Sequence, residues 1–144
     1  MKNINIIIPT YNEEKNILPL IKKIKKYLPL AKICIVDDSK ENNIGKILKK
    51  NYFRRVVYFH RKNQRGRGSA VIFGFKKLFN KNINQIFIEM DADFSHRPSE
   101  LKKNVKLFIK KKSDLMISST YLEKSKILNW SISRKILSKL SNIL

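Results

Sequence analysis

Short runs of apolar, mostly β-branched residues alternate along this chain with longer segments in which apolar residues recur at helical spacing. The first run, Ile4–Ile8, is stopped by Pro9, and residues 17–28 then show the period of a helix. We expect further strands at residues 33–36, 56–59, 86–88 and 115–117, helices at residues 44–50, 71–78 and 98–109, and a last amphipathic helix over residues 131–144. This alternation indicates an α/β fold with a doubly wound, mainly parallel sheet.

Composition agrees with one folded domain. Of the 144 residues, 42% are apolar and 30% are charged, which is typical of a globular chain that is long enough to bury a core. We find no internal repeat or linker and therefore expect a single domain over residues 1–144. The one cysteine, Cys34, excludes an internal disulfide, and with only two histidines the chain has no cysteine/histidine cluster for structural zinc. This cysteine usage is typical of a cytoplasmic protein.

The chain is strongly basic, with 32 Lys and Arg residues against 11 Asp and Glu and a formal net charge of +21. Such a charge first suggests an anionic partner, such as nucleic acid, a membrane surface or phosphate. However, 25 of the 32 basic residues are lysines, whereas arginine suits the planar recognition of phosphates and bases. We therefore expect no nucleic-acid partner and keep a basic nucleic-acid-binding domain only as an alternative function.

No segment of the sequence has the pattern of a targeting or membrane-spanning helix. The apolar run Ile4–Ile8 is shorter than the core of a signal peptide and is interrupted by Asn5, and no window approaches the roughly 20 apolar residues that cross a bilayer. The predicted last helix has isoleucines and a leucine on one face and basic residues elsewhere, which fits either an interfacial helix or a face that packs on further protein. We expect a cytoplasmic protein with at most peripheral contact at the inner face of the membrane.

Polar residues follow each of the first four predicted strands: Thr10–Glu13, Asp37–Asp38, His60–Arg67 and Asp91–Asp93. In a parallel sheet the carboxyl ends of the strands share one edge, and ligands bind in the crevice there. We therefore expect these four clusters to lie together around one ligand site.

The two acidic clusters each allow two interpretations. Asp91 and Asp93 are hard oxygen ligands of the kind that Mg²⁺ or Mn²⁺ prefers, although aspartates also cap helices and form solvated turns. Asp37 and Asp38 stand where doubly wound folds place an acid that holds the ribose or base of a nucleotide, and they also fit a turn closed by hydrogen bonds between Asp and Ser39.

The other two clusters suit a phosphorylated ligand or simple local structure. Thr10 and Glu13 have the spacing of a helix capping box, and Tyr11 and Glu13 are further candidates to face the ligand. The segment Arg61–Ala70 combines cations and glycines and then opens a helix, which suits a diphosphate but equally a basic loop, and it lacks the Gly-Lys-Ser/Thr of a Walker motif. No pattern for a Ser-His-Asp or Cys-His nucleophile is evident.

Four motifs taken in order resemble glycosyltransferase family 2, and within it most closely the dolichol-phosphate (polyprenol-phosphate) mannosyltransferase branch: Ile7–Glu13, Val36–Ser39, Arg65–Ala70 and Met90–Pro98. The similarity continues through Tyr121, Trp130, Arg134, Ser138 and Asn142. It is missing at Thr120, where the family usually has arginine, and at Leu122–Ser125, where the family has a glycine-rich stretch. Since the family's domain continues beyond the residue matched by Leu144, we expect a C-terminally truncated domain that holds mainly the nucleotide-binding portion.

The resemblance implies a Rossmann-like nucleotide-sugar glycosyltransferase. It implies inverting transfer of a hexose, most closely mannose, from GDP-mannose to a polyprenyl or dolichyl phosphate with Mg²⁺ or Mn²⁺. The alternative within the family is a catalytically silent remnant that binds the donor and needs a partner chain or self-association. The resemblance assigns Pro9, Tyr11, Glu13, Ile35 and Asp37 to the nucleotide pocket, Asp91 and Ala92 to the nucleotide, and Asp93 to the metal ion. From the residues themselves, Arg65, Gly66 and Gly68 are the candidates for the diphosphate, and Asp91 joins Asp93 as the candidate metal-binding catalytic pair.

Overall fold

The computed structural model describes residues 3–51 and 53–118. Its elements follow one another as β1 (Asn3–Thr10), α1 (Glu14–Tyr27), β2 (Lys32–Asp37), α2 (Asn43–Lys50), β3 (Val56–His60), α3 (Arg67–Leu78), β4 (Gln85–Glu89), the short 3₁₀ helix η1 (Pro98–Glu100) and α4 (Leu101–Lys111). The first four predicted strands are confirmed, and so is Pro98 at the start of a helical segment.

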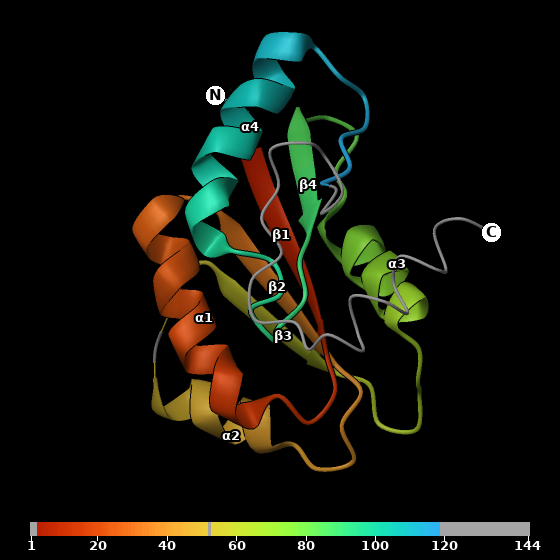
Figure 1. The fold of residues 1–144 in the computed structure, drawn as a ribbon. Coiled ribbons are helices and arrows are strands. Elements are labelled where there is room, and N and C mark those ends of the chain that lie inside the picture. Colours follow the sequence, from red (N-terminus) through yellow and green to blue (C-terminus); the bar gives the residue numbers. More distant parts are fainter. Residues whose placement is uncertain (1–2, 52, 119–144) are drawn as a thin grey trace, which may run out of the picture. The chain divides into compact units, whose positions relative to one another are not determined.

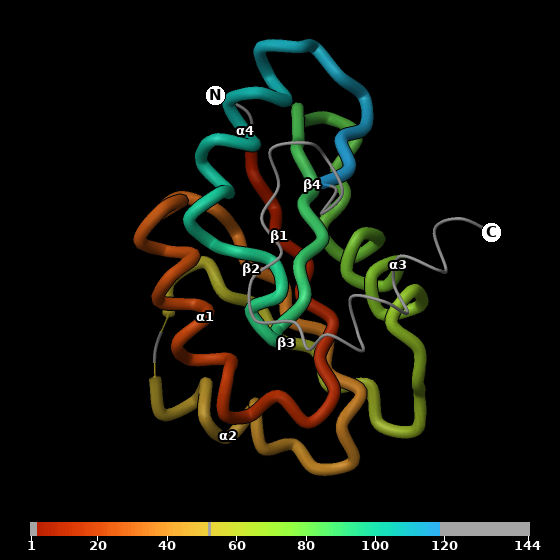
Figure 2. The backbone as a smooth tube through the Cα atoms, viewed as in Figure 1, coloured from red at the N-terminus to blue at the C-terminus, as the bar shows by residue number. Residues whose placement is uncertain are grey.

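The four strands form one parallel sheet in the order β3-β2-β1-β4. The chain steps from β1 through β2 to β3 and then crosses back to place β4 on the other side of β1. The direction of strand order therefore reverses between β1 and β4, and in such sheets this switch point is where ligands bind. Figure 2 shows that the loops leaving β1 and β4 emerge at the same end of the sheet.

Helices cover both faces of the sheet, with α1 and α2 on one face and α3 on the other (Figure 1). The alternation of side chains along each strand divides the core accordingly. Ile6 and Ile8 of β1 pack with α1 and α2, whereas Ile7 packs with Ala70 and Leu78 of α3. The predicted doubly wound α/β fold is confirmed.

A glycine brings α3 close to the sheet. A Cβ atom at Gly74 would lie 2.8 Å from Cγ2 of Ile7 and 3.2 Å from Cγ2 of Val36. Since those atoms belong to packed core side chains, any larger residue would push α3 away. Gly74 therefore allows α3 to lie close against β1 and β2.

One predicted strand is wrong. Residues 115–117 follow α4 as irregular chain, and none of the four described strands pairs with them. Three apolar residues have too little local preference to form a strand unless a neighbouring strand supplies hydrogen bonds. The sheet belongs wholly to the first of two units of the chain, residues 1–107, and residues 115–117 lie beyond it. The predicted last helix, Thr120, Tyr121 and Leu122–Ser125 lie outside the described residues.

Within residues 3–51 and 53–118, no helix combines the length and the apolar composition that crossing a membrane requires.

Candidate active site

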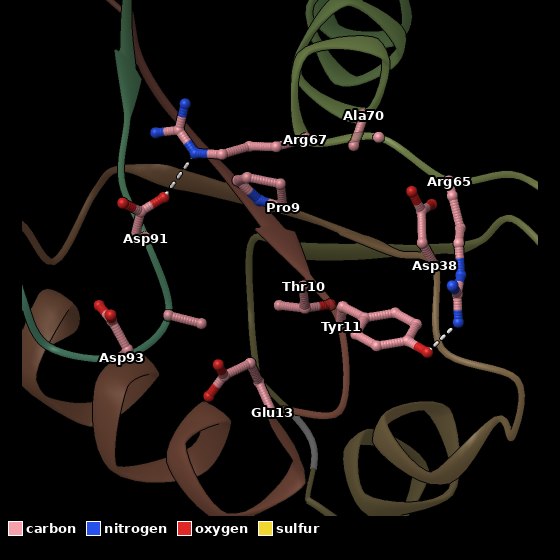
Figure 3. Close-up of a pocket in the computed structure, with 12 residues that line it drawn as sticks. Pro9, Thr10, Tyr11, Glu13, Asp38, Arg65, Arg67, Ala70, Asp91 and Asp93 are labelled. Carbon is pink, nitrogen blue, oxygen red and sulfur yellow. Dashed lines mark hydrogen bonds and ion pairs between the residues drawn. The ribbon is translucent and has the colours of Figure 1, made fainter.

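A pocket of about 430 Å³ opens at the carboxyl ends of β1 and β4, beside the N-terminus of α3 (Figure 3). This is the switch point of the sheet. The pocket is lined by Pro9, Thr10, Tyr11, Glu13, Asp38, Arg65, Gly66, Arg67, Ala70, Asp91, Ala92 and Asp93. Eight of the predicted site residues line it, namely Pro9, Tyr11, Glu13, Arg65, Gly66, Asp91, Ala92 and Asp93.

Three predicted site residues do not line the pocket. Ile35 is fully buried in the core on the α1 side of the sheet. Gly68 lies in the first turn of α3, with open space where a Cβ atom would be. Asp37 is also fully buried. A ligand contact by any of these three residues stays a prediction from the sequence.

The Asp37 carboxylate joins three strands of the sheet. Its Oδ1 accepts hydrogen bonds from the hydroxyl of Thr10 at 3.1 Å and from the hydroxyl of Ser39 at 2.6 Å, and its Oδ2 accepts one from the phenol of Tyr58 at 2.9 Å. Burial and the bond to Asp37 raise the pKa of Tyr58, so that the phenol stays protonated and donates. Nearly all of the acceptor capacity of Asp37 is therefore used within the protein.

Thr10 does not cap a helix as the capping-box spacing suggested. It is the last residue of β1 and its hydroxyl binds Asp37, while helix α1 begins after Glu13, whose side chain makes no capping bond. Between them the chain turns at Asn12, which has a φ of 59° and donates its N–H to the hydroxyl of Ser39 at 2.8 Å. Asparagine tolerates this left-handed conformation, so the turn presents Tyr11 and Glu13 to the pocket.

The Asp38 carboxylate forms a buried, bidentate ion pair with Arg61, which the sequence pattern did not assign to any partner. The distances are 2.7 Å from Nε to Oδ1 and 2.6 Å from an Nη atom to Oδ2, and each side chain is only 5% exposed. Arg61 also donates to the hydroxyl of Ser69 at 3.1 Å and the carbonyl of Gly66 at 3.4 Å. The pair thereby fixes the loop that enters α3.

That loop brings two arginines to the pocket. The Arg65 guanidinium lies 4.7 Å from the centre of the Tyr11 ring and donates a hydrogen bond to its hydroxyl. Gly66 has a φ of 130°, a conformation that favours glycine. Arg67 opens α3 and bonds to Asp91, so the pocket is lined by two arginines that flank the start of this helix. This combination suits an anion such as a diphosphate.

Asp91 and Asp93 line the pocket from the loop after β4 (Figure 3). Oδ1 of Asp91 accepts a hydrogen bond from Nε of Arg67 at 2.9 Å. The backbone N–H of Asp91 donates to Nδ1 of His96 at 3.1 Å. Asp93 accepts a bond from the backbone N–H of Ser95 at 2.9 Å. Partial burial raises the pKa of Asp93, but bonds from Ser95 and the nearby His96 lower it by more, so that its pKa lies below its usual value. Asp93 is therefore ionised at neutral pH.

The acidic pair fits a divalent cation that a ligand helps to hold. Mg²⁺ is commonly bound by one or two carboxylates together with substrate phosphates and water. Over residues 3–51 and 53–118, no group of three or more His, Cys, Asp or Glu side chains gathers as a complete cage. Asp91 and Asp93 would thus supply part of a coordination sphere and phosphate oxygens the rest.

The fold and pocket define a doubly wound α/β protein with a pocket at the switch point of its sheet, and comparison with known proteins gives its family. Residues 5–143 match glycosyl transferase family 2, and the chain belongs to this family. The resemblance noted in the sequence is thereby confirmed.

Two similar proteins carry related names. The chain is 35% identical to the dolichol-phosphate mannosyltransferase of Pyrococcus furiosus, over 94% of this chain and 38% of that protein. It is 32% identical to the polyprenol monophosphomannose synthase of Mycolicibacterium smegmatis, over 95% of this chain and 52% of that protein. The chain thus spans about half of these relatives or less.

A solved structure has a similar fold. Staphylococcus aureus TarS, residues 1–349, superposes with a TM-score of 0.65 at 19% identity, covering 86% of this chain and 40% of that one. At this identity the likeness concerns the fold alone.

Proposed function

We propose that this chain is the donor-binding part of a glycosyltransferase that moves mannose from GDP-mannose to a polyprenyl or dolichyl phosphate. The observation that carries the proposal is one pocket at the switch point of the sheet, lined by the carboxylates of Asp91 and Asp93 and by the arginines Arg65 and Arg67. The names of its relatives, a dolichol-phosphate mannosyltransferase and a polyprenol monophosphomannose synthase, support mannose and a lipid phosphate as substrates.

The nucleotide would occupy the part of the pocket lined by Pro9, Tyr11 and Glu13, with Ala92 beside it. Pro9 and Ala92 give apolar contact, while Glu13 offers a carboxylate that can accept bonds from base or ribose. The Tyr11 ring offers a stacking surface, and 43% of this residue is exposed. Arg65, Gly66 and the N-terminus of α3 would bind the diphosphate through charge and close backbone approach.

A divalent cation, Mg²⁺ or Mn²⁺, would be held by Asp93 and Asp91. When bound, it stabilises the negative charge that grows on a leaving diphosphate. Asp93 is suited to this because it is ionised and keeps one carboxylate oxygen outside the bond to Ser95. A diphosphate beside two carboxylates would be repelled without such a cation.

In the transfer step, an oxygen of the acceptor phosphate attacks the anomeric carbon opposite the diphosphate. The new carbon–oxygen bond forms as the bond to the diphosphate breaks, GDP leaves with the electron pair, and the configuration inverts. The acceptor is already an anion, so no strong general base is required. Arg65 and Arg67 would stabilise the departing GDP by charge.

The acceptor would be reached by peripheral contact at the inner face of the membrane. Because the chain spans at most about half of these two relatives, we propose that efficient transfer needs protein beyond these 144 residues. The alternative is a remnant that binds the donor without transferring sugar. It would give the same donor binding as an active enzyme but no mannose transfer to the lipid phosphate.

Thermal unfolding with GDP, GDP-mannose and UDP-glucose, each with and without Mn²⁺, tests the proposal. GDP-mannose with Mn²⁺ should raise the midpoint most, and Asp93→Asn should remove the Mn²⁺-dependent part of the rise. The absence of a shift with every nucleotide would overturn donor binding. Radiolabelled GDP-mannose with a polyprenyl phosphate then separates an active enzyme from a silent remnant.

A further inference from the structure

Arg67 sits between two carboxylates at the mouth of the pocket. Its Nε lies 2.9 Å from Oδ1 of Asp91, and an Nη atom lies 2.7 Å from Oε1 of Glu89. Asp91 lines the pocket, whereas Glu89 is the last residue of β4 and does not. One guanidinium therefore joins a proposed metal ligand to an anion outside the pocket. Figure 3 shows its bond to Asp91.

These ion pairs are open to solvent. The side chains of Arg67, Glu89 and Asp91 are 56%, 40% and 32% exposed. Exposed ion pairs contribute little to stability and exchange partners easily. The ion pair of Arg61 and Asp38, in contrast, is buried, with both side chains 5% exposed, and its geometry is fixed.

The Arg67 pair conflicts with a metal ion at the same carboxylate. A divalent cation on Asp91 would meet a positive guanidinium that already occupies Oδ1. The two cations repel each other over this short distance, so both cannot bind that oxygen strongly. A bound diphosphate, in contrast, would offer the guanidinium new acceptors at the N-terminus of α3.

We propose that Arg67 is an exchangeable counter-ion of Asp91. Before the donor binds, Arg67 neutralises Asp91 and weakens the binding of a free divalent cation. When the diphosphate arrives, Arg67 turns to it while remaining near Glu89, and Asp91 is released to the metal. The turn toward the diphosphate rests on the function proposed above, whereas the competition at Asp91 does not. The consequence is that metal and nucleotide bind together far better than metal alone.

The test measures Mn²⁺ binding without nucleotide by the electron paramagnetic resonance signal of free Mn²⁺. Arg67→Gln should tighten the Kd for Mn²⁺ by about tenfold, a typical size for coupling between two bound groups. The matched control is Arg65→Gln, which removes the same charge from the same pocket but from a side chain bonded to Tyr11 rather than to a carboxylate. We expect less than about a twofold change there, since exposed charges without direct contact are screened.

Two further variants locate the effect. Adding Asp91→Asn to Arg67→Gln should abolish the gain, because the released ligand is then missing. Glu89→Gln should leave the pair of Arg67 with Asp91 in place and produce no gain in Mn²⁺ affinity. Since Arg67 is exposed, circular dichroism should show the same folded spectrum for all variants.

Equal changes in Mn²⁺ affinity for Arg67→Gln and Arg65→Gln would overturn the proposal, because Arg67 would then act only through net charge. The absence of Mn²⁺ binding by Arg67→Gln would overturn it as well. The function proposed above fails by a different result, namely that GDP binds neither with nor without metal while the Mn²⁺ measurements keep their difference.

Discussion

Two pairs of acidic residues follow strands of the same sheet and have opposite surroundings. Asp37 and Asp38 come at the end of β2, are 0% and 8% exposed, and bind protein groups through both carboxylates. Asp91 and Asp93 come after β4 and line the pocket, and among the described residues their carboxylates bind Arg67 and Ser95. The first pair stabilises the site, and the second pair is available for ligand chemistry.

The place of each strand in the sheet explains the difference. β2 lies between β1 and β3, so residues of both neighbours, such as Thr10 and Tyr58, reach its carboxyl end and enclose the acids. β4 pairs only with β1 among the described strands, so the loop after it is not enclosed in this way. Two acids after a buried strand therefore form a structural pair at one position and a candidate metal pair at the other.

The largest effect should come from breaking the buried ion pair. Arg61→Ala leaves the Asp38 carboxylate buried without its partner, which typically costs about 3–5 kcal/mol. We expect the free energy of unfolding, measured with urea, to fall by that amount. In the control Arg61→Met with Asp38→Leu, much of the stability should return, because no isolated charge remains. A loss below about 1 kcal/mol for Arg61→Ala would show that the pair is not as buried as described.

A smaller loss should follow from changing the other buried acid. Asp37→Asn replaces a carboxylate that accepts bonds from Thr10, Ser39 and Tyr58, and an amide nitrogen cannot accept. We expect a loss of about 1–3 kcal/mol in the free energy of unfolding. If Asp37→Asn has the same free energy of unfolding as the unchanged protein, the Asp37 carboxylate does not stabilise the fold and the contrast with Asp93 is wrong.

The same substitution at the pocket should leave stability nearly unchanged. Asp93 accepts one backbone bond, from Ser95, at an exposed loop. Asp93→Asn should therefore shift the free energy of unfolding by less than about 0.5 kcal/mol, as surface changes do. A loss as large as that of Asp37→Asn, measured in the same urea titrations, would mean that both acidic pairs are structural.

The smallest effect concerns pH. Because the pKa of Asp93 is lowered in the folded protein, its charged form contributes stability above the pKa of the unfolded chain. That contribution should fade as the pH falls through the lower pKa of the folded state. The difference in stability between the unchanged protein and Asp93→Asn should therefore be present at neutral pH and vanish in acid. A difference that grows as the pH falls has the wrong sign for this account.

Local sequence patterns predicted the elements well, because the β-branched runs and the apolar residues at helical spacing match the strands and the two sides of the core. They failed where a distant residue decides the outcome. The Thr10 hydroxyl does not cap a helix, because it donates its hydrogen bond to Asp37, which is 27 positions away in the sequence. Likewise, nothing local separates Asp37 from Asp91, since their burial depends on strand order. The ion pair of Arg61 could not be predicted from local sequence either, because Arg61 follows β3 and its partner Asp38 follows β2.

The central claim is that the acids after β4, unlike those after β2, bind a metal that holds a nucleotide diphosphate. Calorimetry of GDP binding, in Mn²⁺ and in a chelator, tests it most directly on the unchanged protein and on Asp93→Asn. We predict that Mn²⁺ tightens the Kd for GDP by about tenfold or more in the unchanged protein. In Asp93→Asn the two Kd values should be equal. Equal GDP affinity with Mn²⁺ and with chelator in the unchanged protein would contradict the account.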